Sequence, residues 1–132
     1  MVDSIPVLPD STDLRILADR YTAAWCSQDA VSVTAFFGES GSLCINGGMP
    51  AVGRAEITAT AQGFMTGFPD LRVMLDRVVA TDEGAEYHWT LTGTNRGPGG
   101  TGRAVRIGGV EQWRFGADGL VAESVGRFDE GD

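Results

Sequence analysis

The hydrophobic pattern of the chain changes its period about halfway along the 132 residues. Before Leu71, apolar residues recur every three or four positions, which is the spacing of one helix face. From Leu71 onward they alternate with polar residues every second position, which is typical of strands. Helices followed by a run of strands predict an α+β domain.

Three helices are predicted in the first half. The polar run at 10–13 and Asp29 offer carboxylate and hydroxyl oxygens that can cap a helix start. The expected helices run from this polar run to an interruption at 28–29, from Asp29 to about Phe37, and from about Arg54 to Met65, before Pro69. Their apolar faces comprise Leu14, Leu17, Tyr21, Ala24 and Trp25; Ala30, Val33, Phe36 and Phe37; and Ile57, Ala61 and Phe64.

The strands are predicted to form a curved antiparallel sheet on which these three helices pack. The expected strands are 42–46, 71–81, 85–95, 103–115 and 120–128, with turns at 38–41, 82–84 and 117–119 and a Gly-rich loop at 96–102. A curved sheet around helices forms a cone with an internal pocket, lined by the inward residues of each strand. We expect one domain over residues 1–132, of which 1–11 form an N-terminal arm.

Composition narrows the possible functions. The formal charge is −8, from 18 acidic residues and 10 basic ones that are all arginine. An acidic surface repels phosphate, so neither nucleic acid nor an anionic membrane is an expected partner. Without lysine, Schiff-base chemistry, a pyridoxal phosphate anchor and a P-loop lysine are excluded. No apolar run reaches a membrane span of about 20 residues and no signal peptide opens the chain, so a cytoplasmic protein is expected.

Metal and cofactor sites are not expected. Cys26 and Cys44 are two small apolar residues far apart in sequence, and His88 is the single histidine. This set falls short of the ligands that a zinc site needs. The sequence therefore predicts chemistry without a cofactor, or no chemistry.

Four segments resemble the SnoaL-like polyketide cyclases of the nuclear transport factor 2-like superfamily. They are 68–73 (FPDLRV), 86–97 (EYHWTLTGTNRG), 53–57 (GRAEI) and 118–124 (DGLVAES). The resemblance extends over about residues 12–129. It implies the cone fold and, for the cyclase members, an intramolecular aldol closure of a polyketide ring. The superfamily also contains isomerases, hydratases, epoxide hydrolases and plain binding domains, so the fold alone does not settle the reaction.

The resemblance also implies site residues. Asp129 matches the acid/base carboxylate of the last strand, and His88 matches the residue before the Trp-Thr pair of the middle strand. Tyr21 and Asn46 match an aromatic hydroxyl and an amide of the pocket. Ile45 or Asn46 stands where steroid isomerases carry their general-base aspartate, which disfavours that activity.

The residues themselves leave alternatives open. His88 can exchange protons near neutral pH, but strand alternation places it opposite Trp89, so His88 faces outward if Trp89 faces the pocket. Asp129 is either an acid/base or a solvated carboxylate near the chain end. Glu111 is either a pocket carboxylate or half of an outer ion pair. Three further aromatic residues are candidates for ligand contacts or for core packing: Trp25, Phe64 and Trp113.

Two functional hypotheses follow. The first is a cofactor-free acid/base enzyme, of cyclase or isomerase type, that acts on a small hydrophobic carbonyl compound. The second is a binding module that holds a hydrophobic small molecule without reaction. In both cases we expect a homodimer through the exposed sheet face, because strands with apolar residues on both faces leave a patch that helices on one side cannot cover.

Overall fold

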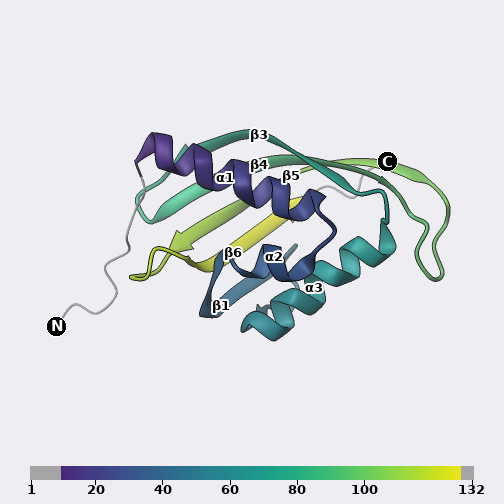
Figure 1. Ribbon diagram of the computed structural model, residues 1–132, viewed down its shortest axis with the longest axis horizontal. Coiled ribbons are helices and arrows are strands. Elements are labelled where there is room, and N and C mark those ends of the chain that lie inside the picture. Colours follow the sequence, from purple (N-terminus) through teal and green to yellow (C-terminus); the bar gives the residue numbers. More distant parts are fainter. Residues whose placement is uncertain (1–9, 129–132) are drawn as a thin grey trace.

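The computed structural model describes residues 10–128, which form three helices and one six-stranded sheet (Figure 1). The helices are α1 (Ser11–Cys26), α2 (Ala30–Thr34) and α3 (Arg54–Gly67). The strands are β1 (Phe37–Ile45), β2 (Ala51–Val52), β3 (Arg72–Ala80), β4 (Gly84–Thr94), β5 (Ala104–Phe115) and β6 (Val121–Phe128), in the sheet order β2-β1-β6-β5-β4-β3. The predicted α+β class and three helices are confirmed.

The helix starts follow the capping chemistry expected from the sequence. Asp10 caps α1, and its carboxylate accepts a hydrogen bond from the backbone N–H of Asp13 at 2.8 Å. Asp29 caps α2 in the same way through Val31 N at 3.1 Å. Each carboxylate satisfies a backbone donor that a helix start leaves without a partner. Of the predicted N-terminal arm, residues 1–9 lie outside the described residues, and Ser11 already belongs to α1.

The prediction was wrong around the start of β1. Phe36 and Phe37 were assigned to the second helix and 38–41 to a turn, but α2 ends at Thr34 and β1 begins at Phe37. Gly41 explains the difference, because a Cβ there would lie 3.1 Å from the carbonyl oxygen of Val121 on β6. The glycine lets the two strands approach closely, which the period of apolar residues does not reveal.

The sheet is mixed where an antiparallel sheet was expected. β1 runs parallel to β6, with Leu43 opposite Ser124, while the β3-β4-β5-β6 meander is antiparallel as predicted. The two-residue strand β2, which pairs antiparallel with β1, was not predicted. The parallel pairing joins segments that lie far apart in the sequence, and β2 is only two residues long, so local periodicity indicates neither feature.

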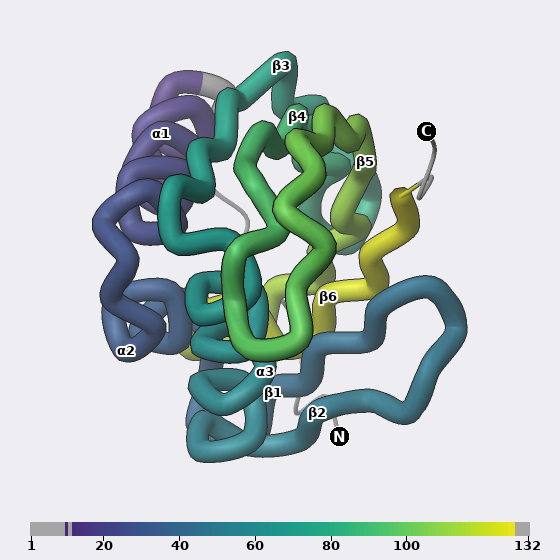
Figure 2. Tube along the Cα trace, turned by 90° about the vertical axis from the view of Figure 1, so that its right-hand side faces the viewer, coloured from purple at the N-terminus to yellow at the C-terminus, as the bar shows by residue number. Residues whose placement is uncertain are grey.

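The helices cover the concave face of the sheet. α1 lies along β3, and α2 packs on α3 next to β1 (Figure 1). The sheet bends strongly toward the β4-β5 hairpin, which comes down beside α3 in Figure 2. The result is a cone that is open on one side, as the sequence predicted.

The β4-β5 hairpin is attached to the end of α3. The backbone N–H groups of Arg96 and Gly97 both donate to the carbonyl oxygen of Gly67 at 3.1 Å. The carboxylate of Asp70 accepts from the backbone N and the hydroxyl of Thr94 at 2.7 and 2.8 Å. These contacts hold the hairpin at the edge of the open side.

Candidate functional site

A cavity of about 750 Å³ lies between the concave face of the sheet and the helices. Its wall is mostly apolar and rich in aromatic rings: Trp25, Phe64, Phe68, Tyr87, Trp89 and Phe128. Aliphatic side chains from β1, β3, β4 and β5 complete it: Leu43, Ile45, Val73, Leu91, Val105 and Ile107. The charged residues that line the cavity are Glu111, Arg103 and Arg106. Such a volume and lining suit a small hydrophobic molecule.

Strand alternation decides which side chains reach the cavity. On β4, Tyr87, Trp89 and Leu91 line it. The residues between them therefore lie on the convex face, and His88 is one of these. The imidazole Nε2 of His88 lies 3.2 Å from Oε1 of Glu86 on that face.

Glu111 is the carboxylate inside the cone. It lies on β5 opposite Tyr87 and is only 8% exposed. Its Oε1 accepts hydrogen bonds from Trp113 Nε1 at 3.0 Å and from Ser124 Oγ at 2.8 Å. The hydroxyl of Tyr21 lies 3.0 Å from Oε1 and 3.2 Å from Oε2. Three donors on three different elements thus hold this carboxyl group in place.

The two oxygens of Glu111 differ in their surroundings. All three donors converge on Oε1, whereas Oε2 receives only the longer contact from Tyr21 among the described residues. Burial raises the pKa of Glu111 above its ordinary value, although the three hydrogen bonds lower it in part. A proton on this group is best placed on Oε2, because Oε1 is already occupied as an acceptor.

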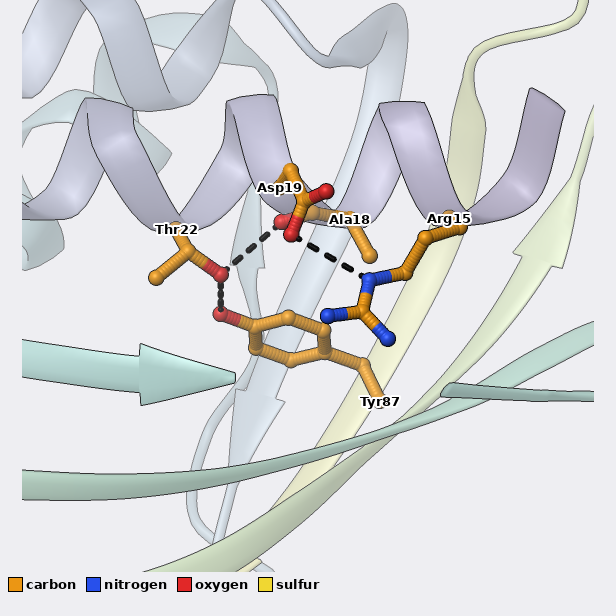
Figure 3. A network of polar contacts seen from close by, with 5 residues as sticks. All are labelled: Arg15, Ala18, Asp19, Thr22 and Tyr87. Atoms are coloured by element: carbon orange, nitrogen blue, oxygen red, sulfur yellow. Dashed lines mark hydrogen bonds and ion pairs between the residues drawn. The ribbon is translucent and has the colours of Figure 1, made fainter. Parts of the chain in front are cut away.

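The hydroxyls of both tyrosines near the cavity, Tyr21 and Tyr87, form hydrogen bonds within the fold. In Figure 3 the Thr22 hydroxyl donates to the carbonyl oxygen of Ala18 at 2.8 Å and also meets the hydroxyl of Tyr87 at 2.5 Å. Because the Thr22 hydroxyl donates its proton to Ala18 O, it can only accept in the second bond, and the Tyr87 hydroxyl is the donor there. The pKa of Tyr87 is raised by burial, and that of Tyr21 is raised by burial and by the nearby Glu111. Neither phenol is poised to lose a proton.

Trp89 has an unsatisfied donor. Its Nε1 is buried and has no hydrogen-bond partner among residues 10–128. The ring lies so close over Gly109 of β5 that a side chain at that position would collide with it. Buried polar groups are rarely left unpaired, so this indole N–H is a candidate for contact with a ligand or with water.

The structure places five of the sequence-derived candidates in three different surroundings. Trp25 and Phe64 line the cavity, while Tyr21 and Trp113 are buried behind it and hold Glu111. Asn46 is exposed, with φ of 52°, and its side-chain oxygen accepts from the backbone N–H of Phe128 at 2.9 Å.

The two residues expected to be catalytic are not brought into the cavity by the described part of the chain. His88 is not one of the residues that line it, and Asp129 lies outside the described residues. The catalytic roles of both stay predictions.

Sequence reasoning left Glu111 between two interpretations, and the structure resolves its location. Glu111 shares a strand face with Ile107 and Trp113, which was visible as alternation. A carboxylate in register with cavity residues was the signal for a buried site. What the pattern did not reveal was the set of donors, since Tyr21 and Ser124 come from distant segments.

Over residues 10–128, no group of three or more His, Cys, Asp and Glu side chains is arranged to hold a metal ion. None of the described helices is long and apolar enough to cross a membrane.

An open α+β cone with a carboxylate on its inner wall defines a pocket-type domain, and sequence comparison gives its family. A family model of the SnoaL-like domain matches residues 18–124, and the chain belongs to this family. No curated protein matches the chain significantly in sequence.

Several solved structures share the fold of this chain. A candidate SnoaL-like polyketide cyclase from Jannaschia sp. CCS1 superposes with a TM-score of 0.80 at 21% identity, covering 92% of this chain and 88% of that one. An NTF2-like (nuclear transport factor 2-like) protein from Exiguobacterium sp. 255-15 has a TM-score of 0.72 at 20% identity, with coverages of 87% and 99%. SalBIII, an epoxide hydrolase/cyclase-like enzyme of pyran ring formation in salinomycin, has a TM-score of 0.77 at 15% identity, with coverages of 92% and 94%. At these identities the likeness shows the fold alone.

Proposed function

We propose that this protein binds a small hydrophobic carbonyl compound in its cone and transfers a proton on it without a cofactor, with Glu111 as the acid/base. The observation that carries the proposal is a buried carboxyl group on the wall of an apolar cavity, with one oxygen left almost free. The reaction class is isomerisation or aldol-type cyclisation, since both begin with proton removal next to a carbonyl group.

The surroundings of Glu111 suit a proton shuttle. Burial raises its pKa toward the range where a carboxyl group can both accept and return a proton. The donors Trp113 and Ser124 hold Oε1, so the group cannot rotate freely and Oε2 keeps one orientation. Fixed orientation of a catalytic group removes an entropic part of the barrier.

The unpaired indole N–H of Trp89 is the donor that we propose for the carbonyl oxygen of the ligand. Trp89 lies opposite Gly109, two residues before Glu111 on β5. Two residues of a strand span roughly 7 Å, so the indole and the carboxyl group can contact neighbouring atoms of one ligand. A donor toward the carbonyl oxygen would stabilise the enolate that forms when the adjacent proton is removed.

A direct test is hydrogen–deuterium exchange next to a carbonyl group. The protein is incubated in D₂O with 2-tetralone, a flat hydrophobic ketone, and loss of the α-proton signal is followed by NMR. We expect the wild type to exchange the α-proton faster than buffer alone does. The rate with Glu111→Gln should be roughly 10²-fold or more below the wild-type rate, because glutamine keeps the shape but cannot transfer the proton. Binding of the ketone, followed by titration, should persist in that variant. Unchanged exchange in Glu111→Gln would contradict the assignment.

The same assay weighs the two candidates that came from the sequence. Asp129→Asn and His88→Gln are measured beside Glu111→Gln under identical conditions. We expect His88→Gln to exchange like the wild type, because its imidazole lies on the convex face beside Glu86. A loss in Asp129→Asn alone would assign the proton transfer to the last-strand carboxylate that the family resemblance implies.

A second candidate function is binding without reaction. The three hydrogen bonds to Glu111 favour it, because they also serve to satisfy a carboxyl group that is merely buried. Saturable binding of the ketone with no exchange above buffer in the wild type would select this alternative. Failure to bind any hydrophobic ligand would reject both.

The convex face of the sheet supports a homodimer proposal. Met74 on β3 and Val79 on the same strand are 41% and 40% exposed, and Val110 and Val125 continue this face. A contiguous exposed apolar patch on a sheet face is typical of an interface. Light scattering should return a dimer mass, and Val79→Arg should shift it to the monomer. A cytoplasmic location stays a prediction.

A further inference from the structure

Two arginines border the open side of a cavity whose wall is otherwise mostly apolar. Arg103 comes directly before β5 and Arg106 lies within it, and both are exposed. Arg103 has the strand parity of Val105 and Ile107, whose partly buried side chains line the wall. Its guanidinium is therefore the better placed of the two to meet a ligand.

The backbone at Arg103 is held in position. Its carbonyl oxygen accepts from Asn95 N at 2.9 Å, and its own N–H donates to Thr101 Oγ1 at 3.3 Å. The hairpin that carries it is fixed to the end of α3 through Gly67. A group on an anchored hairpin is better suited to recognition than one on a free loop.

The charge of Arg103 is not used inside the described fold. Among residues 10–128 the ion pairs join Arg15 to Asp19, His88 to Glu86 and Arg114 to Glu123, and none involves Arg103 or Arg106. The chain carries a net charge of −8, so carboxylates are plentiful elsewhere on it. Two arginines without such a partner at the rim of an apolar cavity create a local preference for anions.

We propose that the ligand of this cavity is an elongated apolar molecule with a carboxylate at one end, and that Arg103 binds this carboxylate at the rim. The inference rests on the proposed function, because it describes the ligand of the same cavity. It places the apolar body of the ligand along β5 toward Glu111. The eight residue steps from Arg103 to Glu111 span at most roughly 26 Å of strand, which limits the ligand length between these two groups.

Three probes with the same alkyl chain separate this inference from general electrostatics. Decanoate, decanol and decyltrimethylammonium are titrated calorimetrically into the wild type at low ionic strength, below their micelle-forming concentrations. The overall negative charge of the protein favours the cation and disfavours the anion. If Arg103 binds the carboxylate, decanoate should bind more tightly than the cation, and about fivefold more tightly than decanol. Added salt should reduce this advantage.

The variant Arg103→Gln tests the assignment to one residue. It should remove the advantage of decanoate over decanol and leave the affinity for decanol unchanged. Arg77→Gln is the matched control, since Arg77 is exposed on β3 opposite His88 and the substitution changes the net charge equally. Arg77→Gln should keep the preference for decanoate.

The outcomes distinguish the two proposals. If decanol binds but decanoate binds no better, the carboxylate inference is overturned and the proposed cavity function stands. An equal loss of preference in Arg77→Gln and Arg103→Gln also overturns it, because the effect would then come from net charge. If none of the three probes binds but 2-tetralone does, the carboxylate inference is overturned and the proposed function stands. If 2-tetralone does not bind either, the proposed function itself fails.

Discussion

Carboxyl groups on the concave and convex faces of the same sheet differ in burial and in hydrogen bonding. Glu111 on β5 and Glu86 on β4 lie on neighbouring strands, one residue out of step, so they point to opposite sides. Glu111 is buried and receives three hydrogen bonds from neutral donors. Glu86 is 36% exposed and has one contact, with His88. The inner carboxyl group is thus built into the fold, and the outer one is shared with solvent.

This difference predicts that the inner carboxyl group contributes more to stability than the outer one. A buried carboxyl group needs compensating donors, and removing it leaves those donors unpaired in the core. The partly exposed pair of His88 and Glu86 adds little to the free energy of unfolding, because water screens the interaction. Four measurements test this difference between the two faces, and the expected effect decreases from the first to the last.

The largest effect is expected from Glu111→Ala. The free energy of unfolding should fall by about 3 kcal/mol, since Trp113 Nε1 and Ser124 Oγ lose their acceptor and a cavity opens. Glu86→Ala should lower it by less than about 0.5 kcal/mol. Urea denaturation measures both. Equal losses in the two variants would show that the faces do not differ.

The second effect is on the pH dependence of stability. Because the pKa of Glu111 is raised in the folded state, the folded protein holds this proton more tightly than the unfolded chain. Its contribution is complete below the ordinary value of 4.5 and is lost as the pH rises through the raised pKa. The difference in unfolding free energy between the wild type and Glu111→Gln should therefore decrease with pH, by at most about 1.4 kcal/mol per unit. A difference that stays constant, or that grows, would contradict the raised pKa.

A smaller effect is expected at the contact between α1 and β4. Thr22→Val leaves the Tyr87 hydroxyl without its acceptor (Figure 3), and the loss in unfolding free energy should be about 1 kcal/mol. Thr90→Val is the control on the convex face, where the hydroxyl donates to Asp76 in an exposed position. We expect its cost to be below about 0.5 kcal/mol. Similar costs at both sites would mean that the Thr22 bond is not protected from water.

The smallest effect concerns the outer pair itself. A double-mutant cycle with His88→Gln and Glu86→Gln should give a coupling energy of about 0.5 kcal/mol or less, which added salt removes. The cycle is measured by denaturation at two protein concentrations. A coupling well above this value, present only at high protein concentration, would instead show that a second subunit covers the convex face.

Local chemistry predicted most of the fold. The change from helical to strand period at Leu71 placed the three helices and the β3-β6 meander, because periodicity reports which side of each element is buried. Asp10 and Asp29 were recognisable as caps, because a cap depends only on the next few residues. The errors were the strand start at 35–41, where Gly41 permits a close approach to β6, the short strand β2, and the parallel pairing of β1 with β6.

The candidate site was only partly predictable. Trp25 and Phe64 were candidates for either ligand contacts or core packing, and the structure places both on the cavity wall. Which face of β4 is inward could not be decided from alternation alone, since both faces carry bulky groups. The position of His88 therefore depended on the packing of Trp89 against Gly109.

The sequence indicated the three helices, the β3-β6 meander, the absence of lysine chemistry and the residues that share each strand face. The tertiary fold sets three further features: Glu111 is an inner carboxyl group, Tyr21 and Ser124 donate to it, and Arg103 lines the same cavity. The physical reason is distance along the chain. Periods and caps depend on neighbouring residues, whereas the surroundings of Glu111 depend on β5, β6 and α1 meeting in the core, with Tyr21 lying 90 residues away in sequence.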